Sequence, residues 1–250
     1  MTYQKYNASG NDFIIFHTFK EDDYSSLAKK LCHRQEGIGA DGLIALVPSK
    51  ESKADFAWDF YNSDGSKASM CGNGSRAAAH YAFSNNLVKN DKKLSFISDA
   101  GIISCELSSK NIIKSEMTKP KILKESFDED GFAWHLIDTG VPHLVTFVND
   151  LAKFDKILAS KLRKKYNANV NFAMLKNKKL FVRTFERGVE DETLACGTGM
   201  CACFLQAFNS KLLSNEAKVY PRSKEELSIS FENNSLFFEG KVTKVFSLCL

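Results

Sequence analysis

The sequence predicts an α/β fold of the α+β type, in which two similar lobes each wrap a mixed, mostly antiparallel sheet around a central helix. Three observations lead to this prediction. Many short strand patterns occur beside few helical ones, without the regular alternation of a doubly wound fold. A segment of the first half of the chain is repeated in the second half. Each copy of that segment ends in a helix that is apolar on nearly all sides.

Strands are predicted where apolar and polar residues alternate, because such a strand buries one face. The clearest examples are residues 56–60 (FAWDF) and 180–185 (LFVRTF). Further strands are expected near residues 42–47, 94–98, 101–107, 134–138, 142–148, 170–175, 227–231 and 242–248. Helical periodicity is found near residues 25–33, 73–87, 155–166 and 198–213.

The repeated segment reads FAWDFYNSDGSKASMCGNGSRAAAHYAF in the first half and LFVRTFERGVEDETLACGTGMCACFLQAF in the second. Phe60 precedes Cys71 by 71 − 60 = 11 positions, and Phe185 precedes Cys196 by 196 − 185 = 11. A helix that is apolar all round is buried, so each should lie inside the sheet of its own lobe. We expect one lobe at residues 1–114, completed by the last strand at about 240–250, and the other at 115–239. A polar, Lys-rich linker is expected at residues 110–131.

Composition excludes several classes of protein. With 250 residues, 44% of them hydrophobic, the chain can bury a sizeable core. The net charge of +4 is scattered, so no nucleic-acid partner is expected. No apolar run approaches the roughly 20 residues of a membrane helix, and no apolar signal core opens the chain, so we expect a soluble, cytoplasmic protein. Seven cysteines without a CxxC pair argue against a disulfide framework and against a metal site.

Cys71 and Cys196 each open a C-G-x-G turn that leads into a helix. The amino end of a helix presents unpaired N–H groups and a partial positive charge, which favour a thiolate and can cradle a carboxylate. Asn73 and Thr198 occupy matching places in the two turns. Inversion of a carbon centre needs one group to take a proton from one face and another to deliver a proton to the opposite face. Two such turns therefore point to a two-thiol racemase or epimerase.

Six segments resemble the diaminopimelate epimerase family in sequence and in order. They are ASGNDFIIF (8–16), GIGADGLI (37–44), YNSDGSKASMCGNGSR (61–76), DTGVPHLV (138–145), NVNFAML (169–175) and RTFERGVEDETLACGTGMCA (183–202). The resemblance implies two α/β lobes with the site between them, and a homodimer. It also implies interconversion of LL- and meso-diaminopimelate without pyridoxal phosphate or metal, on the route to lysine and peptidoglycan.

The same resemblance assigns the site residues. Cys71 and Cys196 would be the two bases, and His143 and Glu186 would assist proton transfer. The carboxylate at the reacting centre would be bound by Gly72, Asn73, Gly197 and Thr198. The distal end would be bound by Asn11, Asn62, Asn171, Glu186 and Arg187. The family often has Asn at the place of Val141, and some members have Gln at the place of Gly42, so these two polar contacts are missing here.

Other functions stay open at this stage. A proline racemase-like enzyme would also use two cysteines, but that group has a histidine in the first turn where this chain has Asn73. A binding module for an anionic metabolite would use the glycine loops and leave both cysteines idle. A cysteine hydrolase with His143 would leave the second turn unused. Judged by residues alone, Arg187 could instead pair with a surface carboxylate, and the asparagines could be turn residues.

Overall fold

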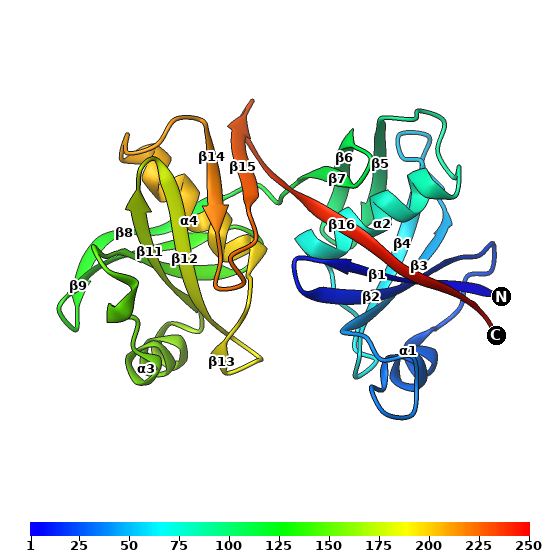
Figure 1. Ribbon diagram of the computed structural model, residues 1–250, viewed down its shortest axis with the longest axis horizontal. Coiled ribbons are helices and arrows are strands. Elements are labelled where there is room, and N and C mark those ends of the chain that lie inside the picture. Colours follow the sequence, from blue (N-terminus) through cyan, green and yellow to red (C-terminus); the bar gives the residue numbers. More distant parts are fainter. The chain divides into compact units, whose positions relative to one another are not determined.

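The computed structural model describes all residues, 1–250, and they form two compact units (Figure 1). Unit 1 contains Met1–Glu116 and Gly240–Leu250, and unit 2 contains Met117–Glu239. The sequence placed this boundary after residue 114. The last strand, β16 (Ser235–Cys249), contributes its first residues to unit 2 and the remainder to unit 1.

Unit 1 is a sheet in the order β16-β1-β2-β3-β4-β5-β6-β7, with two helices. The β2–β3 and β4–β5 pairs are parallel, and the other pairs within this order are antiparallel. The elements are β1 (Thr2–Ala8), β2 (Asn11–His17), α1 (Ser25–Cys32), β3 (Gly42–Pro48), β4 (Phe56–Asn62), α2 (Gly72–Ser84), β5 (Lys93–Ser98), β6 (Gly101–Ser109) and β7 (Ile112–Glu116).

Unit 2 repeats this plan in the order β8-β9-β10-β11-β12-β14-β15-β16. Here β10–β11 and β12–β14 are the parallel pairs, at the same places in the order as in unit 1. The elements are β8 (Lys121–Glu129), β9 (Phe132–Asp138), β10 (Pro142–Phe147), a 3₁₀ turn (Leu151–Lys153), α3 (Lys156–Tyr166), β11 (Asn169–Lys176), β12 (Lys179–Glu186), β13 (Asp191–Glu192), α4 (Gly197–Asn209), β14 (Glu216–Tyr220) and β15 (Leu227–Glu232).

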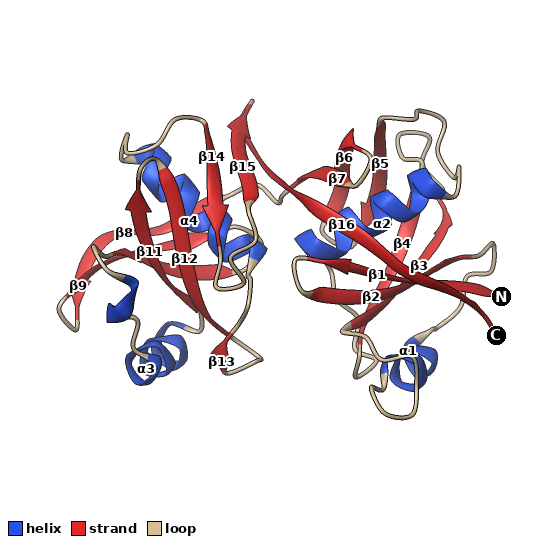
Figure 2. Cartoon of the chain, in the orientation of Figure 1, coloured by secondary structure: helices blue, strands red, loops and turns tan.

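One helix lies inside the sheet of each unit, as the sequence predicted (Figure 2). Helix α2 contacts β1, β2, β3, β6 and β7, and its alanines are fully buried in one aromatic-rich core. Helix α4 contacts β9, β10, β11, β12 and β15, and its residues from Gly199 to Leu205 are buried. Small and apolar side chains allow a helix to be enclosed on all sides. The predicted fold class is confirmed.

The remaining helices cover the outer faces of the sheets. Helix α1 packs on β3 and β4, where Ala28, Leu31 and Cys32 are buried against Phe16 and Tyr61. Helix α3 packs on β11 and β12 through Ala159 and Leu162. Strands β2 and β3 are therefore covered on both faces. None of the helices combines the length and the apolar character needed to span a membrane.

The predicted linker is the main error in the sequence-based description. Residues 110–131 contain β7 and β8, joined by only a short connection. Strand β8 leaves nearly every side chain partly or fully exposed, so no apolar alternation marks it. Strands β1, β2 and β14 were also missed. In β2 the run Phe13–Phe16 is buried on both faces, and such a run lacks the period of two by which half-buried strands are recognised.

Candidate active site

Cys71 is the residue that caps the amino end of α2. Its backbone is extended (φ −149°, ψ 118°), and its Sγ accepts a hydrogen bond of 3.4 Å from the N–H of Gly74. The thiol of Cys71 is partly buried. A helix N–H directed at sulfur stabilises negative charge there. The turn thus presents the thiol in the way that the C-G-x-G motif predicts.

A polar network connects this turn to β2. Asn73, 5% exposed, donates from Nδ2 to Asn11 Oδ1 at 2.6 Å, and its Oδ1 accepts from Arg76 Nη2 at 2.9 Å. Arg76 also donates to Ser9 Oγ at 2.7 Å. Asn11 in turn donates to Asp41 Oδ2 at 3.1 Å. Two predicted substrate-binding residues, Asn11 and Asn73, are therefore in direct contact, and Arg76 is a fully buried support that sequence reasoning missed.

Charged groups anchor the loops around this network. Arg34 binds both carboxylate oxygens of Asp12, at 2.9 and 3.2 Å, and reaches Asp41 at 2.7 Å. Lys5 lies 3.0 Å from Asp12. Burial opposes ionisation of Asp12, but the hydrogen bonds from Arg34 and Lys5 outweigh it and lower the pKa of this carboxyl. The loop that carries Asn11 is thus fixed by ion pairs on its neighbours.

Asn62 ends β4 and is exposed. Its Nδ2 donates to Ser66 Oγ at 3.0 Å, while the N–H of Ser63 donates to the carbonyl of Asp41 at 3.0 Å. The side chain of Asn62 is therefore tied to its own turn, and that turn is joined to Asp41 of the network. Gly42 lies opposite Asn62 in the sheet. A Cβ at Gly42 would come within 2.6 Å of the Phe60 ring, so the packing explains why a larger residue is missing there.

Cys196 occupies the matching position before the first turn of α4, but its side chain accepts no capping hydrogen bond from the helix N–H groups. Its backbone is extended (φ −122°, ψ 107°), its Sγ lies 3.5 Å from Thr198 Oγ1, and the residue is 6% exposed. Thr139 Oγ1 donates to the carbonyl of Thr198 at 2.8 Å and so ties the turn to the end of β9. Burial, with Cys196 and Cys201 nearby, raises the pKa of Cys203 well above its ordinary value. Cys203 therefore stays a protonated core thiol.

Gly197 and Gly199 let the turn approach its surroundings closely. A Cβ at Gly197 would lie 3.1 Å from the ring of Phe238. A Cβ at Gly199 would lie 2.3 Å from Asn171 Oδ1, which no real side chain could tolerate. Asn171 therefore lies directly beneath the first turn of α4. Its side chain is fully buried, and its amide makes hydrogen bonds to His143, Leu144 and Thr184.

His143 is fully buried on β10. Burial and the positive charge of Arg187 lower the pKa of His143 to about 3, so the imidazole is neutral at physiological pH. Asn171 Nδ2 lies 3.1 Å from Nδ1 of the ring, and Asn169 Nδ2 lies 3.5 Å from Nε2. The ring is therefore held between two asparagine side chains of β11.

Asn169 lies beside Arg187, and sequence reasoning missed it. The backbone N–H of Arg187 donates to Asn169 Oδ1 at 2.7 Å, and the guanidinium donates to the carbonyl of Asn167 at 3.0 Å. Asn169 and Asn171 are two positions apart and face the same side of β11, so the NVNFAML motif did not distinguish them. The structure places Asn171 under the helix and Asn169 next to the guanidinium that was assigned to the distal end.

The buried carboxylate of Glu192 holds the chain that follows Glu186 and Arg187. Glu192, whose side chain is 1% exposed, accepts from Arg183 Nε at 2.6 Å and from Nη2 at 2.8 Å. Arg222 lies 3.4 Å from the same carboxylate. Burial raises the pKa of Glu186 above its ordinary value. Glu192 is another support that the sequence analysis did not identify.

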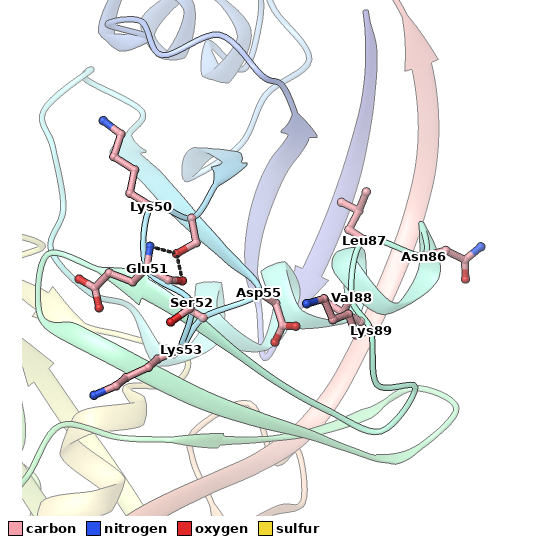
Figure 3. A pocket seen from close by; sticks show the side chains of 11 residues that line it. Lys50, Glu51, Ser52, Lys53, Asp55, Asn86, Leu87, Val88 and Lys89 are labelled. Atoms are coloured by element: carbon pink, nitrogen blue, oxygen red, sulfur yellow. Dashed lines mark hydrogen bonds between the residues drawn. The ribbon is translucent and has the colours of Figure 1, made fainter.

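A hollow of about 720 Å³ in unit 1 is separate from these residues (Figure 3). It is lined by residues 49–55 and 86–89, where Ser49 Oγ donates to the carbonyl of Glu51 and accepts from its N–H. None of the predicted site residues lines it. No group of three or more His, Cys, Asp and Glu side chains is placed to hold a metal ion.

Comparison with known proteins identifies close relatives. The family model of diaminopimelate epimerase matches residues 3–123 and 135–245. A diaminopimelate epimerase of a Nitratiruptor species is 57% identical over 247 residues, which cover 98% of this chain and 97% of the relative. One from Campylobacter jejuni (strain RM1221) is 53% identical with the same coverage, and one from Helicobacter pylori (strain HPAG1) is 43% identical over 97% of this chain and 93% of the relative.

Solved structures of lower sequence identity share the fold. A putative phenazine biosynthesis protein from Clostridium difficile (strain 630) superimposes with a TM-score of 0.76 at 14% identity, over 100% of this chain and 99% of that chain. A probable proline racemase from Agrobacterium radiobacter K84 gives a TM-score of 0.73 at 11% identity, over 100% and 92%. The family model matches in both units, and the full-length relatives carry the same name. The chain therefore belongs to the diaminopimelate epimerase family.

Proposed function

We propose that the chain is an isomerase that interconverts LL- and meso-2,6-diaminopimelate, with Cys71 and Cys196 as its two bases. The observation that carries this proposal is the equivalence of the two cysteines. Each immediately precedes the first turn of the helix inside its unit, at the same point in a repeated strand order. Relatives of 43–57% identity that are named diaminopimelate epimerase support the choice of substrate.

The reaction needs two thiols in different protonation states. A thiolate removes the proton from the α-carbon, and a thiol delivers a proton to the opposite face, so the two cysteines exchange states in each turnover. The negative charge that develops on the substrate carboxylate is stabilised by the N–H groups at Gly72, Asn73, Gly197 and Thr198, at the positive ends of α2 and α4. No cofactor takes part in this scheme. The substrate loses one proton and gains another on the opposite face, so it is converted to its epimer with no net change in composition.

In this proposal polar side chains bind the distal amino acid end of the substrate. Arg187 supplies a guanidinium, which is suited to pair with a carboxylate. Asn11 and Asn62 supply amides, and Glu186 supplies a carboxyl that can accept from an ammonium group. We assign Asn169 rather than Asn171 to this set, because the Asn169 side chain contacts the backbone of Arg187, whereas the buried amide of Asn171 is hydrogen-bonded to Leu144 and Thr184.

In this proposal the role of His143 is to form a hydrogen bond rather than to transfer a proton. A ring whose pKa is about 3 does not exchange protons efficiently near neutral pH, because its charged form is too rare.

We place the protein in the cytoplasm as a homodimer that supplies lysine and peptidoglycan precursor synthesis. The thiols of Cys32, Cys105, Cys203 and Cys249, which form no disulfide, suit a reducing compartment.

The test is turnover of LL-diaminopimelate in D₂O, followed by NMR of the α-proton. The wild-type protein should place solvent deuterium at the inverted centre. Cys71→Ala and Cys196→Ala should each abolish epimerisation, because each direction needs both an acid and a base. Cys249→Ala, at an exposed position, is the matched control and should retain full activity. Full epimerisation by either single variant would remove that cysteine from the mechanism.

Substrate choice is tested separately. Arg187→Met should raise KM and lower kcat/KM, because the distal carboxylate loses its charged partner. Proline lacks that carboxylate and should be a poor substrate for the wild-type protein. Turnover of proline as fast as that of diaminopimelate would instead favour a racemase of the proline type.

A further inference from the structure

A polar cluster lies under the amino end of α4, at positions where unit 1 is apolar. In unit 2 the cluster is His143, Asn171 and Thr184, on the neighbouring strands β10, β11 and β12. All three residues are buried, with exposed fractions of 0, 0 and 4%. Asn171 lies opposite Thr184 in the antiparallel β11–β12 pair. Burial of polar groups costs stability unless hydrogen bonds compensate it.

The matching positions in unit 1 follow from the strand register. The first pair of the parallel β10–β11 ladder in unit 2 is His143 with Asn169, and the first pair of the parallel β2–β3 ladder in unit 1 is Phe13 with Gly42. Phe13 therefore corresponds to His143, and Gly42 corresponds to Asn169. Two residues further along β3 and β11, Ile44 corresponds to Asn171. Phe60, opposite Ile44, corresponds to Thr184.

Gly74, the counterpart of Gly199, rests on these apolar groups: its Cβ would lie 3.5 Å from Ile44 and 3.6 Å from Phe13. Support of the turn therefore does not require polar side chains. The polar cluster of unit 2 calls for a different explanation.

The orientation of the Asn171 amide is fixed by two neighbours. Its Nδ2 donates to the carbonyl of Leu144 at 2.9 Å, and its Oδ1 accepts from Thr184 Oγ1 at 2.8 Å. Rotation of the amide by half a turn would place Oδ1 against the carbonyl oxygen of Leu144, and two acceptors repel each other. Nδ2 is therefore the atom that faces His143.

This orientation determines which nitrogen of His143 carries hydrogen. Nδ2 can only donate, so Nδ1, at 3.1 Å, must accept. A neutral imidazole has one donor and one acceptor, and its hydrogen must then be on Nε2. The neighbour of Nε2 is Asn169 Nδ2 at 3.5 Å, which is also a donor and cannot accept this hydrogen.

We propose that Asn171 is a positioning residue that holds His143 in the tautomer with hydrogen on Nε2, so that this N–H donates to a carboxylate oxygen of the substrate. The second half rests on the proposed function, because it needs a carboxylate ligand next to Arg187. The first half concerns the protein alone. Partners that fix a histidine tautomer in this way are known to control what the other ring nitrogen can do.

The substitution Asn171→Asp reverses the hydrogen bond. A carboxylate accepts from Nδ1–H, so the variant should favour hydrogen on Nδ1 and leave Nε2 as an acceptor facing the substrate. We expect kcat/KM to fall by about tenfold or more, since one donor to the substrate is replaced by a repelling lone pair. Asn177→Asp is the matched control, because it makes the same chemical change on the exposed turn between β11 and β12. It should leave both activity and tautomer unchanged.

The tautomer is read directly by two-bond ¹H–¹⁵N correlation spectra of protein labelled with ¹⁵N-histidine. The chain has five histidines, and loss of one pattern in His143→Gln assigns the signal. At pH 7 the wild-type ring should show an acceptor-type Nδ1 and a protonated Nε2. A protonated Nδ1 or an imidazolium in the wild-type protein would overturn the proposal, even if the Asp variant does not fold.

Activity and tautomer can fail independently. If diaminopimelate is not turned over but Nε2 is protonated, the function is wrong while the role of Asn171 toward His143 stands. If Asn171→Asp folds and keeps the wild-type tautomer, Asn171 does not control His143. If the tautomer changes and kcat/KM with diaminopimelate stays at the wild-type value, the hydrogen bond from Nε2 to substrate is refuted.

Discussion

Substitution of the two turn glycines should have unequal effects on stability. Gly74 and Gly199 occupy the same position in α2 and α4, three residues after the capping cysteine. At Gly199 an added Cβ would lie 2.3 Å from Asn171 Oδ1 and 3.2 Å from Thr184 Oγ1. At Gly74 the closest atom would be the Cβ of Cys71 at 3.3 Å. The first contact is impossible without movement, and the second needs a shift of only a few tenths of an ångström.

The magnitude follows from what must move. Gly199→Ala displaces the side chain of Asn171 and removes its three hydrogen bonds, each contributing about 1 kcal/mol. Replacement of glycine by alanine within a helix returns about 1 kcal/mol. The net loss is about 2 kcal/mol, which lowers the Tm of a chain of this length by roughly 4–8 °C. Gly74→Ala gains the same helix term against a mild contact and should stay within about 1 kcal/mol of wild type.

The two tryptophans allow each unit to be followed separately. Trp58 is buried in unit 1 and Trp134 in unit 2, so urea unfolding monitored by fluorescence in Trp58→Phe reports unit 2, and Trp134→Phe reports unit 1. Gly199→Ala should lower the urea midpoint of unit 2, while Gly74→Ala should leave that of unit 1 nearly unchanged. If Gly199→Ala is as stable as wild type, or if Gly74→Ala is the more damaging change, the close packing of α4 on Asn171 is wrong.

Two further predictions concern charged groups. Glu192→Ala should destabilise unit 2 by about 3 kcal/mol, because it leaves the partly buried Arg183 without its carboxylate. The control is Asp130→Asn, which removes an exposed ion pair and keeps a residue type that tolerates the positive φ of this position. The free energy of unfolding in urea should fall by less than about 1 kcal/mol in this control. The pKa of Asp12 is lowered in the folded protein. Its ionised form therefore stabilises the fold at pH values above its ordinary pKa of about 4. This stabilisation is lost as the pH falls through the lowered pKa. The difference in stability between wild type and Asp12→Asn should therefore shrink in acid, and a difference that is constant from pH 7 to pH 2 would contradict the proposed ion pairs.

Much of the fold could be predicted because its signals are local. Each C-G-x-G turn and the apolar helix after it form one continuous stretch, so the repeat was visible without knowledge of the sheet. Glycine at residues 72 and 197, next to cysteine, marks a helix start in both copies. Half-buried strands such as β4 and β12 were also found, since alternation directly reflects their two faces.

The residues that hold the site residues in place could not be predicted from the sequence, because only their tertiary contacts distinguish them from other residues of the same type. Arg76 and Glu192 are charged residues in a sequence that contains many, and only their complete burial distinguishes them. Asn169 and Asn171 share a strand face and a motif. Which of them lies beneath α4 depends on where the helix crosses β11, and that position is not encoded in either residue.

Phe60 and Phe185 lie at equal distances in sequence from their cysteines, but they are not equivalent positions in the two sheets. Alignment of the repeats by spacing is therefore wrong by one residue. Phe60 packs in the core around α2, whereas Phe185 packs in the outer cluster with α3. A strand side chain moves to the opposite face when the register shifts by one residue. The sheet therefore matches Phe60 with Thr184, 12 positions before Cys196 (196 − 184), so the connection in unit 2 is one residue longer. With that correction the inner positions of the two units differ in chemistry, apolar beneath Gly74 and polar beneath Gly199, and the repeated turns cannot be treated as interchangeable copies.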